Sequence, residues 1–189
     1  MRIKDYLQNK PLRIYLLKFA LAFCFLYFGT LAVIGISAPG GLYNSFIAQH
    51  LNYIDWLRSA LLHVSKIVVN IFGFKSRIFN DYVLGIPEGH SVRMVYKCVG
   101  YGVMSFWGAF IFANNITWQR KILWILSGWL MIFIINVIRI AALVIAVNTN
   151  TKLPVAIDHH TIFNIVAYAL IFCMIWIFDK KTTAKVHAN

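Results

Sequence analysis

Long runs of apolar residues dominate the chain, and four of them approach or exceed the length that crosses a lipid bilayer. A spanning helix needs about 20 apolar residues, because each residue advances the helix by about 1.5 Å. The first run exceeds the ~7–15 apolar residues of a cleavable signal peptide, so we expect a retained helix. The four predicted spans are Ile14–Ile36, about Tyr96–Ala113, Ile122–Val147 and Thr161–Phe178.

A fifth apolar segment, Leu51–Phe74, differs because polar residues recur in it every three or four positions. This spacing places them on one stripe of a helix. Asp and Lys at bilayer depth are costly, whereas an amphipathic helix on the outer surface keeps them in water. We therefore expect an amphipathic helix, with an additional membrane helix as the alternative. The stripe comprises Asn52, Asp55, Ser59, His63, Lys66 and Asn70.

Basic residues lie beside the apolar runs and predict the orientation of the chain. The N-terminus, the loop Asn114–Lys121 and the tail after Phe178 are all basic. Positive charge marks the cytoplasmic side, so both ends are expected inside and residues 37–95 and 148–160 outside. The net charge of +12 is then a signal for topology and for anionic lipid headgroups. We expect membrane lipids as partners and no nucleic acid.

The composition supports a membrane protein with one helical domain over residues 1–189. Hydrophobic residues make up 60% and charged residues 13%, about half the charged share of a soluble domain. The expected fold is all-α: a polytopic membrane bundle of about four spanning helices plus one amphipathic or additional membrane helix. Gly85, Pro87 and Gly89 predict turns, and the alternation in Ser91–Tyr96 predicts a short extended piece.

The chain has three cysteines, an odd number that excludes a closed disulfide framework. Cys24 and Cys173 lie within apolar runs and are expected to pack in the core. Cys98 lies at the outer start of the second run. Gly100 and Gly102 follow it, and such small residues let another helix or a substrate backbone approach.

Three residues capable of chemistry are expected at the same outer membrane face. Cys98 begins the second span, and His160 precedes the fourth. Arg139 lies about 25 Å along the third, just under the outer surface of a core about 30 Å thick. Asn136, three residues earlier, shares its helix face. Each residue alone is more simply a packing, snorkelling or solvated side chain, but their convergence favours a site.

A cysteine, an arginine and a histidine together can support nucleophilic catalysis. A thiol needs a nearby base or cation to become a thiolate. Histidine can accept its proton and return it to a leaving amine. Arginine cannot act as a base, but it can stabilise a thiolate or an oxyanion.

Three short motifs resemble those of the exosortase/archaeosortase family. These are Cys-Val-Gly at 98–100, Asn-Val-Ile-Arg-Ile at 136–140 and His-Thr-Ile-Phe-Asn at 160–164. Their order, their spacing and their setting between apolar runs all match. The resemblance covers about residues 92–178, the family-like catalytic portion. The chain departs from the usual motif in having Val99 between cysteine and glycine.

The resemblance implies a cysteine transpeptidase or peptidase of the bacterial inner membrane, with its active site at the periplasmic face. Its partners would be precursor proteins that carry a C-terminal sorting helix, and a polysaccharide or lipid acceptor. Cys98 would be the nucleophile, Arg139 the thiolate or oxyanion stabiliser and His160 the general acid and base. Asn136, Gly100 and His159 are supporting residues, and His159 competes with His160. No cofactor or metal is implied.

Two other classes of function stay open on the residues alone. Cys98, His159 and His160 suit zinc, and His63, His90 or Asp158 would have to complete the site. Alternatively, the protein is a non-enzymatic subunit or scaffold of an export or polysaccharide-assembly system.

Overall fold

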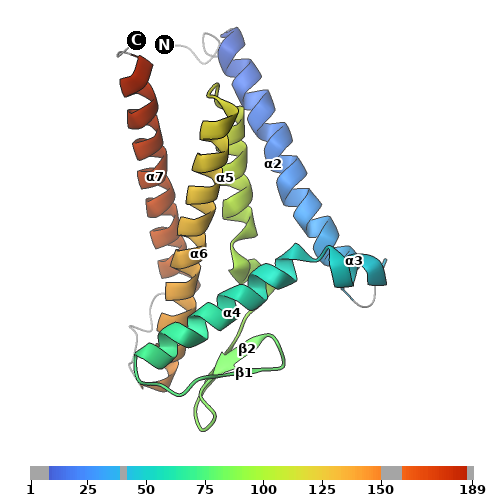
Figure 1. Cartoon of the computed structure of the whole chain (residues 1–189), viewed down its shortest axis with the longest axis vertical. Helices are drawn as coiled ribbons and strands as arrows, with labels where there is room; N and C mark the ends of the chain where they lie inside the picture. The colour runs from blue at the N-terminus through green and yellow to red at the C-terminus, as the bar shows by residue number, and fades with distance from the viewer. Residues whose placement is uncertain (1–8, 39–41, 150–158, 187–189) are drawn as a thin grey trace.

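The computed structural model describes residues 9–38, 42–149 and 159–186, and this part of the chain is mostly helical (Figure 1). Four helices run roughly along the long axis of the molecule. They are α2 (Lys10–Ser37), α5 (Tyr101–Ala113), α6 (Trp118–Asn148) and α7 (His159–Val186). Helix α2 packs against α5, α5 against α6, and α6 against α7.

Two of the described helices, α2 and α6, are long and apolar enough to cross a membrane. They match the first and third predicted spans, while the total of about four spans stays a prediction. The second predicted span, Tyr96–Ala113, is wrong in its first part. Residues Tyr96–Val99 form a 3-10 helix, η1, and α5 begins only at Tyr101. Gly100 separates them with φ of +85°, a left-handed conformation that an α-helix cannot contain.

Helix α4 (Tyr53–Ile71) lies obliquely across the lower ends of α5 and α6 rather than alongside them (Figure 1). A short helix, α3 (Ser45–His50), leads into it from α2. The expected polar stripe is exposed in part, since Ser59, His63 and Asn70 are exposed and Asp55 and Lys66 are half-buried. Asn52 is wrong as a water-facing residue of the stripe, because it is 3% exposed. The opposite face of α4 is buried and comprises Ile54, Arg58, Leu61, Leu62, Ser65 and Val69.

A small antiparallel sheet follows α4, so the fold is not purely helical. Its strands are β1 (Arg77–Phe79), β2 (Val83–Gly85) and β3 (Ser91–Arg93), in the order β1-β2-β3. Leu84 pairs with Ile78 on one side and Val92 on the other. The predicted extended piece at Ser91–Tyr96 is therefore confirmed for its first half. The turn between β2 and β3 contains Pro87 and Gly89, as expected, whereas Gly85 is the last residue of β2 rather than part of a turn.

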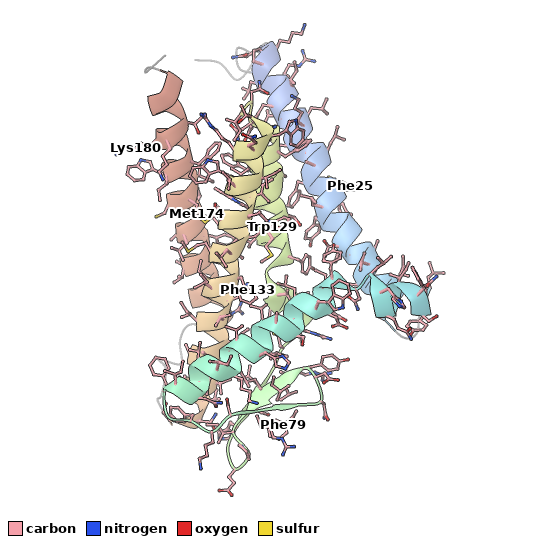
Figure 2. The ribbon with its side chains drawn as sticks, viewed as in Figure 1. Phe25, Phe79, Trp129, Phe133, Met174 and Lys180 are labelled. Carbon is pink, nitrogen blue, oxygen red and sulfur yellow. The ribbon has the colours of Figure 1, made fainter. Side chains whose placement is uncertain are left out.

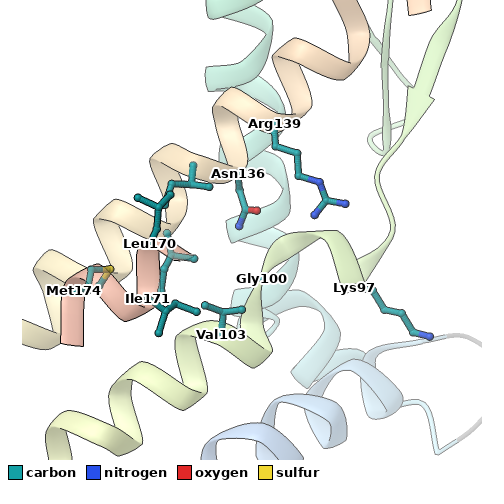
Figure 3. A pocket seen from close by; sticks show the side chains of 10 residues that line it. Lys97, Gly100, Val103, Asn136, Arg139, Leu170, Ile171 and Met174 are labelled. Carbon is teal, nitrogen blue, oxygen red and sulfur yellow. The ribbon is translucent and has the colours of Figure 1, made fainter. Parts of the chain in front are cut away.

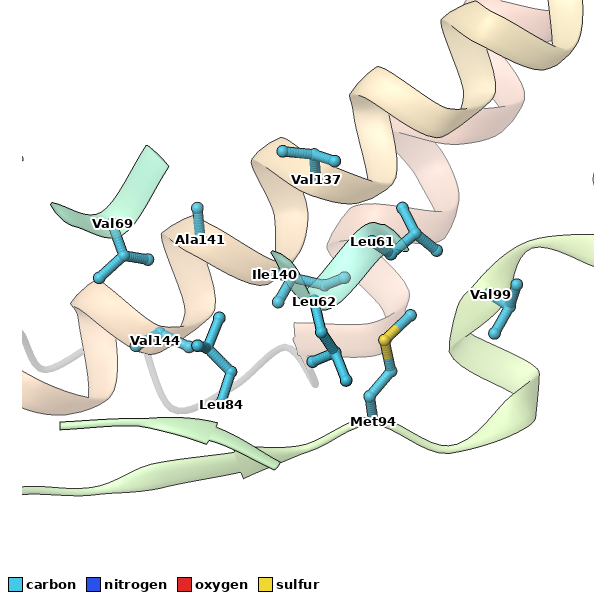
Figure 4. Packing of buried hydrophobic residues seen from close by; sticks show 10 residues of the cluster. All are labelled: Leu61, Leu62, Val69, Leu84, Met94, Val99, Val137, Ile140, Ala141 and Val144. Atoms are coloured by element: carbon cyan, nitrogen blue, oxygen red, sulfur yellow. The ribbon is translucent and has the colours of Figure 1, made fainter. Parts of the chain in front are cut away.

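Two hydrophobic clusters hold these elements together. The larger joins α4, β2, η1 and α6 below the bundle (Figure 4), and its buried members are Leu61, Leu62, Val69, Leu84, Met94, Val99, Val137, Ile140, Ala141 and Val144. The smaller lies between α5, α6 and α7 around the fully buried Trp107. There Gly128 of α6 lets the indole of Trp107 approach, because a Cβ at Gly128 would overlap the ring.

Cys24 and Cys173 do not pack in the core. Both are free and exposed, on α2 and α7 respectively. Spanning helices are apolar on every side, since lipid as well as protein surrounds them, so apolar neighbours in the sequence do not indicate which side is packed. The expectation of two core cysteines was wrong for this reason.

The basic segments gather at one end of the molecule. The start of α2, the connection between α5 and α6, and the last turns of α7 lie together at the top of Figure 1. Lys180 lies near this end, whereas Phe79 of the sheet lies at the opposite end (Figure 2). Helix α4, the sheet and η1 are thus placed away from these three basic segments, as the predicted topology requires, although they carry basic residues of their own.

Candidate functional site

The candidate site lies where η1, α5, α6 and α7 meet. A cavity of about 80 Å³ opens there, enough for a few water molecules. Its polar lining comes from Lys97, Asn136 and Arg139, and Figure 3 shows how these residues lie around it. The rest of the lining is Gly100, Val103, Ile132, Ile135, Leu170, Ile171 and Met174.

Asn136 fixes the turn that leads from η1 into α5. Its side-chain amide nitrogen donates a hydrogen bond of 3.0 Å to the carbonyl oxygen of Val99. Asn136 is 8% exposed, so this bond is formed away from bulk water. Gly100 makes the approach possible, because a Cβ there would lie 2.6 Å from the same amide nitrogen. Asn136 and Gly100 thus bring the two segments into close contact, while their supporting roles in catalysis stay a prediction.

Arg139 lies one helical turn after Asn136 and lines the same cavity. The predicted shared face of these two residues is therefore observed. The side chain of Arg139 is half-buried, and Figure 3 shows it on the same side of α6 as Asn136, above the turn at Gly100. A guanidinium in this position can attract an anion or a developing negative charge in the cavity.

Cys98 lies in η1, ahead of the second apolar helix rather than inside it. Its backbone nitrogen donates to the carbonyl oxygen of Val95 at 2.9 Å, which closes the 3-10 turn. The thiol is free and half-buried, and it packs against the larger hydrophobic cluster. Cys98 itself does not line the cavity, but its neighbour Lys97 and Gly100 two residues later do. The cavity thus borders the segment that contains Cys98, although not Cys98 itself.

His159 and His160 are the first two residues of α7, and their side chains lie outside the described residues, as does Asp158. Helix α7 reaches the cavity through Leu170, about ten residues and 15 Å further along its axis. The N-terminal end of α7 points toward the end of the molecule that holds α4 (Figure 1). The meeting of His160 with Cys98 stays a prediction.

Sequence reasoning missed Arg58, a charged residue on the buried face of α4. Arg58 is 6% exposed and forms an ion pair with Asp55, three residues earlier. Its guanidinium carbon lies 3.9 Å from the ring centroid of Tyr82 and 4.5 Å from that of Tyr96. The signal was present, because Arg58 falls on the helix face of Ile54, Leu61 and Leu62 rather than on the polar stripe.

Tyr96 is the first residue of η1, and its phenol is affected by the charges of Arg58 and Asp55. Burial raises the pKa of its phenol, the positive charge of Arg58 acts in the opposite direction, and the negative charge of Asp55 reinforces the rise. The phenol consequently stays neutral across the physiological pH range. Its hydroxyl donates a long hydrogen bond of 3.5 Å to an Asp55 carboxylate oxygen.

A zinc site, the alternative on the residues alone, has no cluster of ligands in the described part of the chain. There, no three side chains of His, Cys, Asp or Glu gather to hold a metal ion. His63 and His90 are both exposed and lie on different elements, α4 and the segment before β3.

Comparison with known proteins agrees with the motifs. A family model described as transmembrane exosortase matches residues 8–177. The match begins ahead of α2, so it extends well beyond the portion from residue 92 onward in which the sequence motifs lie. No curated protein and no solved structure matches the chain.

Proposed function

Because the chain belongs to the transmembrane exosortase family, we propose that it is a protein-sorting enzyme that uses Cys98 as its nucleophile. Its substrates would be secreted precursors with a C-terminal signal made of a short motif, a transmembrane helix and a basic cluster. The enzyme would cut at the motif and transfer the new acyl end to an acceptor. The transfer makes it a transpeptidase, and transfer to water would make it a peptidase.

In the first step the Cys98 thiol loses its proton to His160, and the sulfur bonds to the carbonyl carbon of the scissile peptide. The carbonyl π electrons move to oxygen, and Arg139 stabilises the resulting oxyanion. When the intermediate collapses, the C–N bond breaks and His160 returns the proton to the leaving amine. The released fragment is the transmembrane helix with its basic tail, and the precursor remains as a thioester on Cys98.

In the second step an acceptor nucleophile attacks the thioester carbonyl. His160 takes the proton of the acceptor, and the C–S bond breaks to release the thiolate of Cys98. The proton then returns to the sulfur, which restores the free enzyme. A thioester is more reactive than the peptide it replaces, so the acceptor can be a lipid or polysaccharide hydroxyl, an amine or water.

The observation that carries this proposal is the cavity at the turn from η1 to α5. Asn136 holds the carbonyl of Val99, and Arg139 lies one turn away on the same wall. Gly100 lines the same cavity, and its missing side chain lets Asn136 approach the turn. All four residues lie within the two sequence motifs that contain Cys98 and Arg139.

We further propose that the site faces the periplasm of a bacterial inner membrane. The basic ends of α2, α6 and α7 support this orientation, since they lie opposite to η1. A sorting helix in the same membrane has its basic cluster on the cytoplasmic side, which places its motif at the outer face. Enzyme and substrate would then meet at the same depth.

The test compares cells that carry the wild-type chain with cells that carry Cys98→Ala, at equal expression. Mass spectrometry of membrane proteins should find precursors that keep their C-terminal helix and basic tail only in the mutant. Cys173→Ala is the matched control, because Cys173 is an exposed cysteine on α7 and should leave processing unchanged. If no C-terminus changes in Cys98→Ala cells, the catalytic proposal fails and a scaffold role becomes the better interpretation.

A further inference from the structure

Arg58 is a buried charge in a position that would ordinarily hold an apolar residue. Its neighbours on the buried face of α4 are Ile54, Leu61 and Leu62, each at most 1% exposed. Removing an arginine from water is costly unless its charge and its donors find partners. Hydrophobic packing alone therefore does not explain why an arginine occupies this buried position.

The partners of Arg58 come from three separate segments. Asp55 on α4 supplies the counter-charge. Tyr82, in the turn after β1, and Tyr96, the first residue of η1, place their rings against the guanidinium at 3.9 and 4.5 Å. The planar cation thus contacts two aromatic rings at once, an arrangement in which arginine gains both cation–π and stacking contacts.

Asn52 holds the acidic partner in place. Its side-chain amide donates to one carboxylate oxygen of Asp55 at 3.1 Å, and its side-chain oxygen accepts from the Asp55 backbone nitrogen at 3.2 Å. The other carboxylate oxygen receives Arg58 and the hydroxyl of Tyr96. Asn52 is 3% exposed, so this end of the cluster is also protected from water. We call Asn52, Asp55, Arg58, Tyr82 and Tyr96 the arginine cluster.

The arginine cluster holds one end of η1, and Asn136 holds the other. Tyr96 is the first residue of this four-residue helix and Val99 is its last. Tyr96 contacts α4 through Arg58, and the carbonyl of Val99 is bound by Asn136 of α6. Cys98 lies between these two anchors. A single 3-10 turn has poor hydrogen-bond geometry of its own, so its position depends on such anchors.

We propose that Arg58 is a positioning residue for Cys98. This inference rests on the proposed function in one respect, namely that Cys98 is the nucleophile. Arg58 fixes Tyr96, Tyr96 fixes the start of η1, and the cysteine two residues later is held half-buried against the hydrophobic cluster. Asp55 balances the charge of Arg58, so the effect on the thiol is one of placement rather than of charge.

The reactivity of the Cys98 thiol tests this placement without any substrate. The full chain is studied in its membrane, with Cys24→Ser and Cys173→Ser so that Cys98 is the remaining cysteine. Iodoacetamide alkylation is followed by mass spectrometry, and thermal unfolding is measured on the same samples. Arg58→Lys keeps the charge but loses the planar stack between the rings.

Arg58→Lys should raise the alkylation rate of Cys98 about tenfold, because loss of the ring contacts releases η1 and exposes the thiol. A factor of about ten corresponds to the free energy of one or two cation–π contacts. The same variant with all its cysteines present should process precursors more slowly by about the same factor, when the rates are compared at equal amounts of folded protein. A residue that only stabilises the fold would change these two rates no more than a control substitution does at the same loss of thermal stability. Tyr96→Phe keeps the ring and should behave like wild type, whereas Tyr96→Ala should reproduce Arg58→Lys.

Val69→Ala is the control for general destabilisation, because Val69 is fully buried on the same helix and in the same cluster as Cys98. The proposal is overturned if Arg58→Lys changes Cys98 alkylation no more than Val69→Ala does at a matched loss of thermal stability. The proposed function fails separately, if processing survives Cys98→Ala. In that event a changed alkylation rate would still establish that Arg58 positions the cysteine.

Discussion

The side-chain amide of Asn136 and the backbone carbonyl of Val99 are joined by a hydrogen bond of 3.0 Å that crosses from α6 to η1. The bond is buried, and it bridges two motifs that are far apart in the sequence. It also explains the glycine that follows. Residue 100 has φ of +85° and lies so close to Asn136 that a side chain would displace the amide.

Gly100→Ala should therefore destabilise the protein and reduce processing. The left-handed conformation costs an alanine about 1–2 kcal/mol, and the contact of its Cβ with Asn136 adds to this cost. The measurement is thermal unfolding of purified protein in detergent, together with precursor processing in cells. Gly102→Ala is the matched control, because its Cβ would meet Tyr27 at an ordinary 3.5 Å and without a left-handed φ. Equal effects of the two substitutions would contradict this account.

The sequence predicted those features that depend on local pattern. The length of the apolar runs predicted α2 and α6, and the spacing of polar residues predicted the amphipathic character of α4. Helical spacing also predicted that Asn136 and Arg139 share one face of α6. The motifs also gave the family. Gly100 was expected to allow a close approach, and a left-handed φ at the end of a helix is usual for glycine. That this conformation would place Cys98 outside the second apolar helix was not predicted.

The missed features depend on contacts between distant segments. The arginine cluster joins α4 to Tyr82 and Tyr96, and no periodicity within one helix reveals which rings will surround an arginine. The same holds for Lys97, whose place in the cavity wall follows from the turn at Gly100. Cys24 and Cys173 were misplaced because an apolar helix in lipid carries no mark of its packed side.

Arg139→Gln should lower the processing rate by about 10²–10³-fold, which is the usual cost of losing one oxyanion donor. Arg139→Lys should retain part of the rate, because it keeps a charge but loses the fork of donors. Arg139 also has contacts within the fold, so the amount of folded protein is measured in parallel. Arg120→Gln, at the opposite end of α6, should leave the rate unchanged. An Arg139→Gln enzyme that is fully folded and fully active would remove arginine from the mechanism.

Processing should slow as the pH falls below about 6.5, where an unperturbed histidine becomes protonated and His160 can no longer act as a base. A profile that is flat from about pH 5 to 8 would argue against His160. His160→Gln should abolish the dependence along with most of the rate, and His159→Gln should preserve both.

Tyr96 should not contribute to that pH profile. Burial raises the pKa of its phenol above its ordinary value, so the neutral form is favoured in the folded protein. The stability gained in this way is complete below a pH of about 10 and is lost only as the pH rises through the elevated pKa. Tyr96→Phe should consequently leave the acidic limb of the profile in place, and a shifted limb in that variant would show that Tyr96 titrates with the site.

The orientation of the chain can be tested with single cysteines in a protein whose own cysteines are replaced by serine. His63 is exposed on α4, and Arg120 is exposed in the first turn of α6 at the basic end. A membrane-impermeant maleimide added to spheroplasts should label His63→Cys at once, because the predicted topology places α4 on the outer surface. Arg120→Cys should react only after the membrane is opened. If α4 instead crossed the bilayer, position 63 would lie near its middle, where little thiolate forms, and would stay unlabelled on both sides.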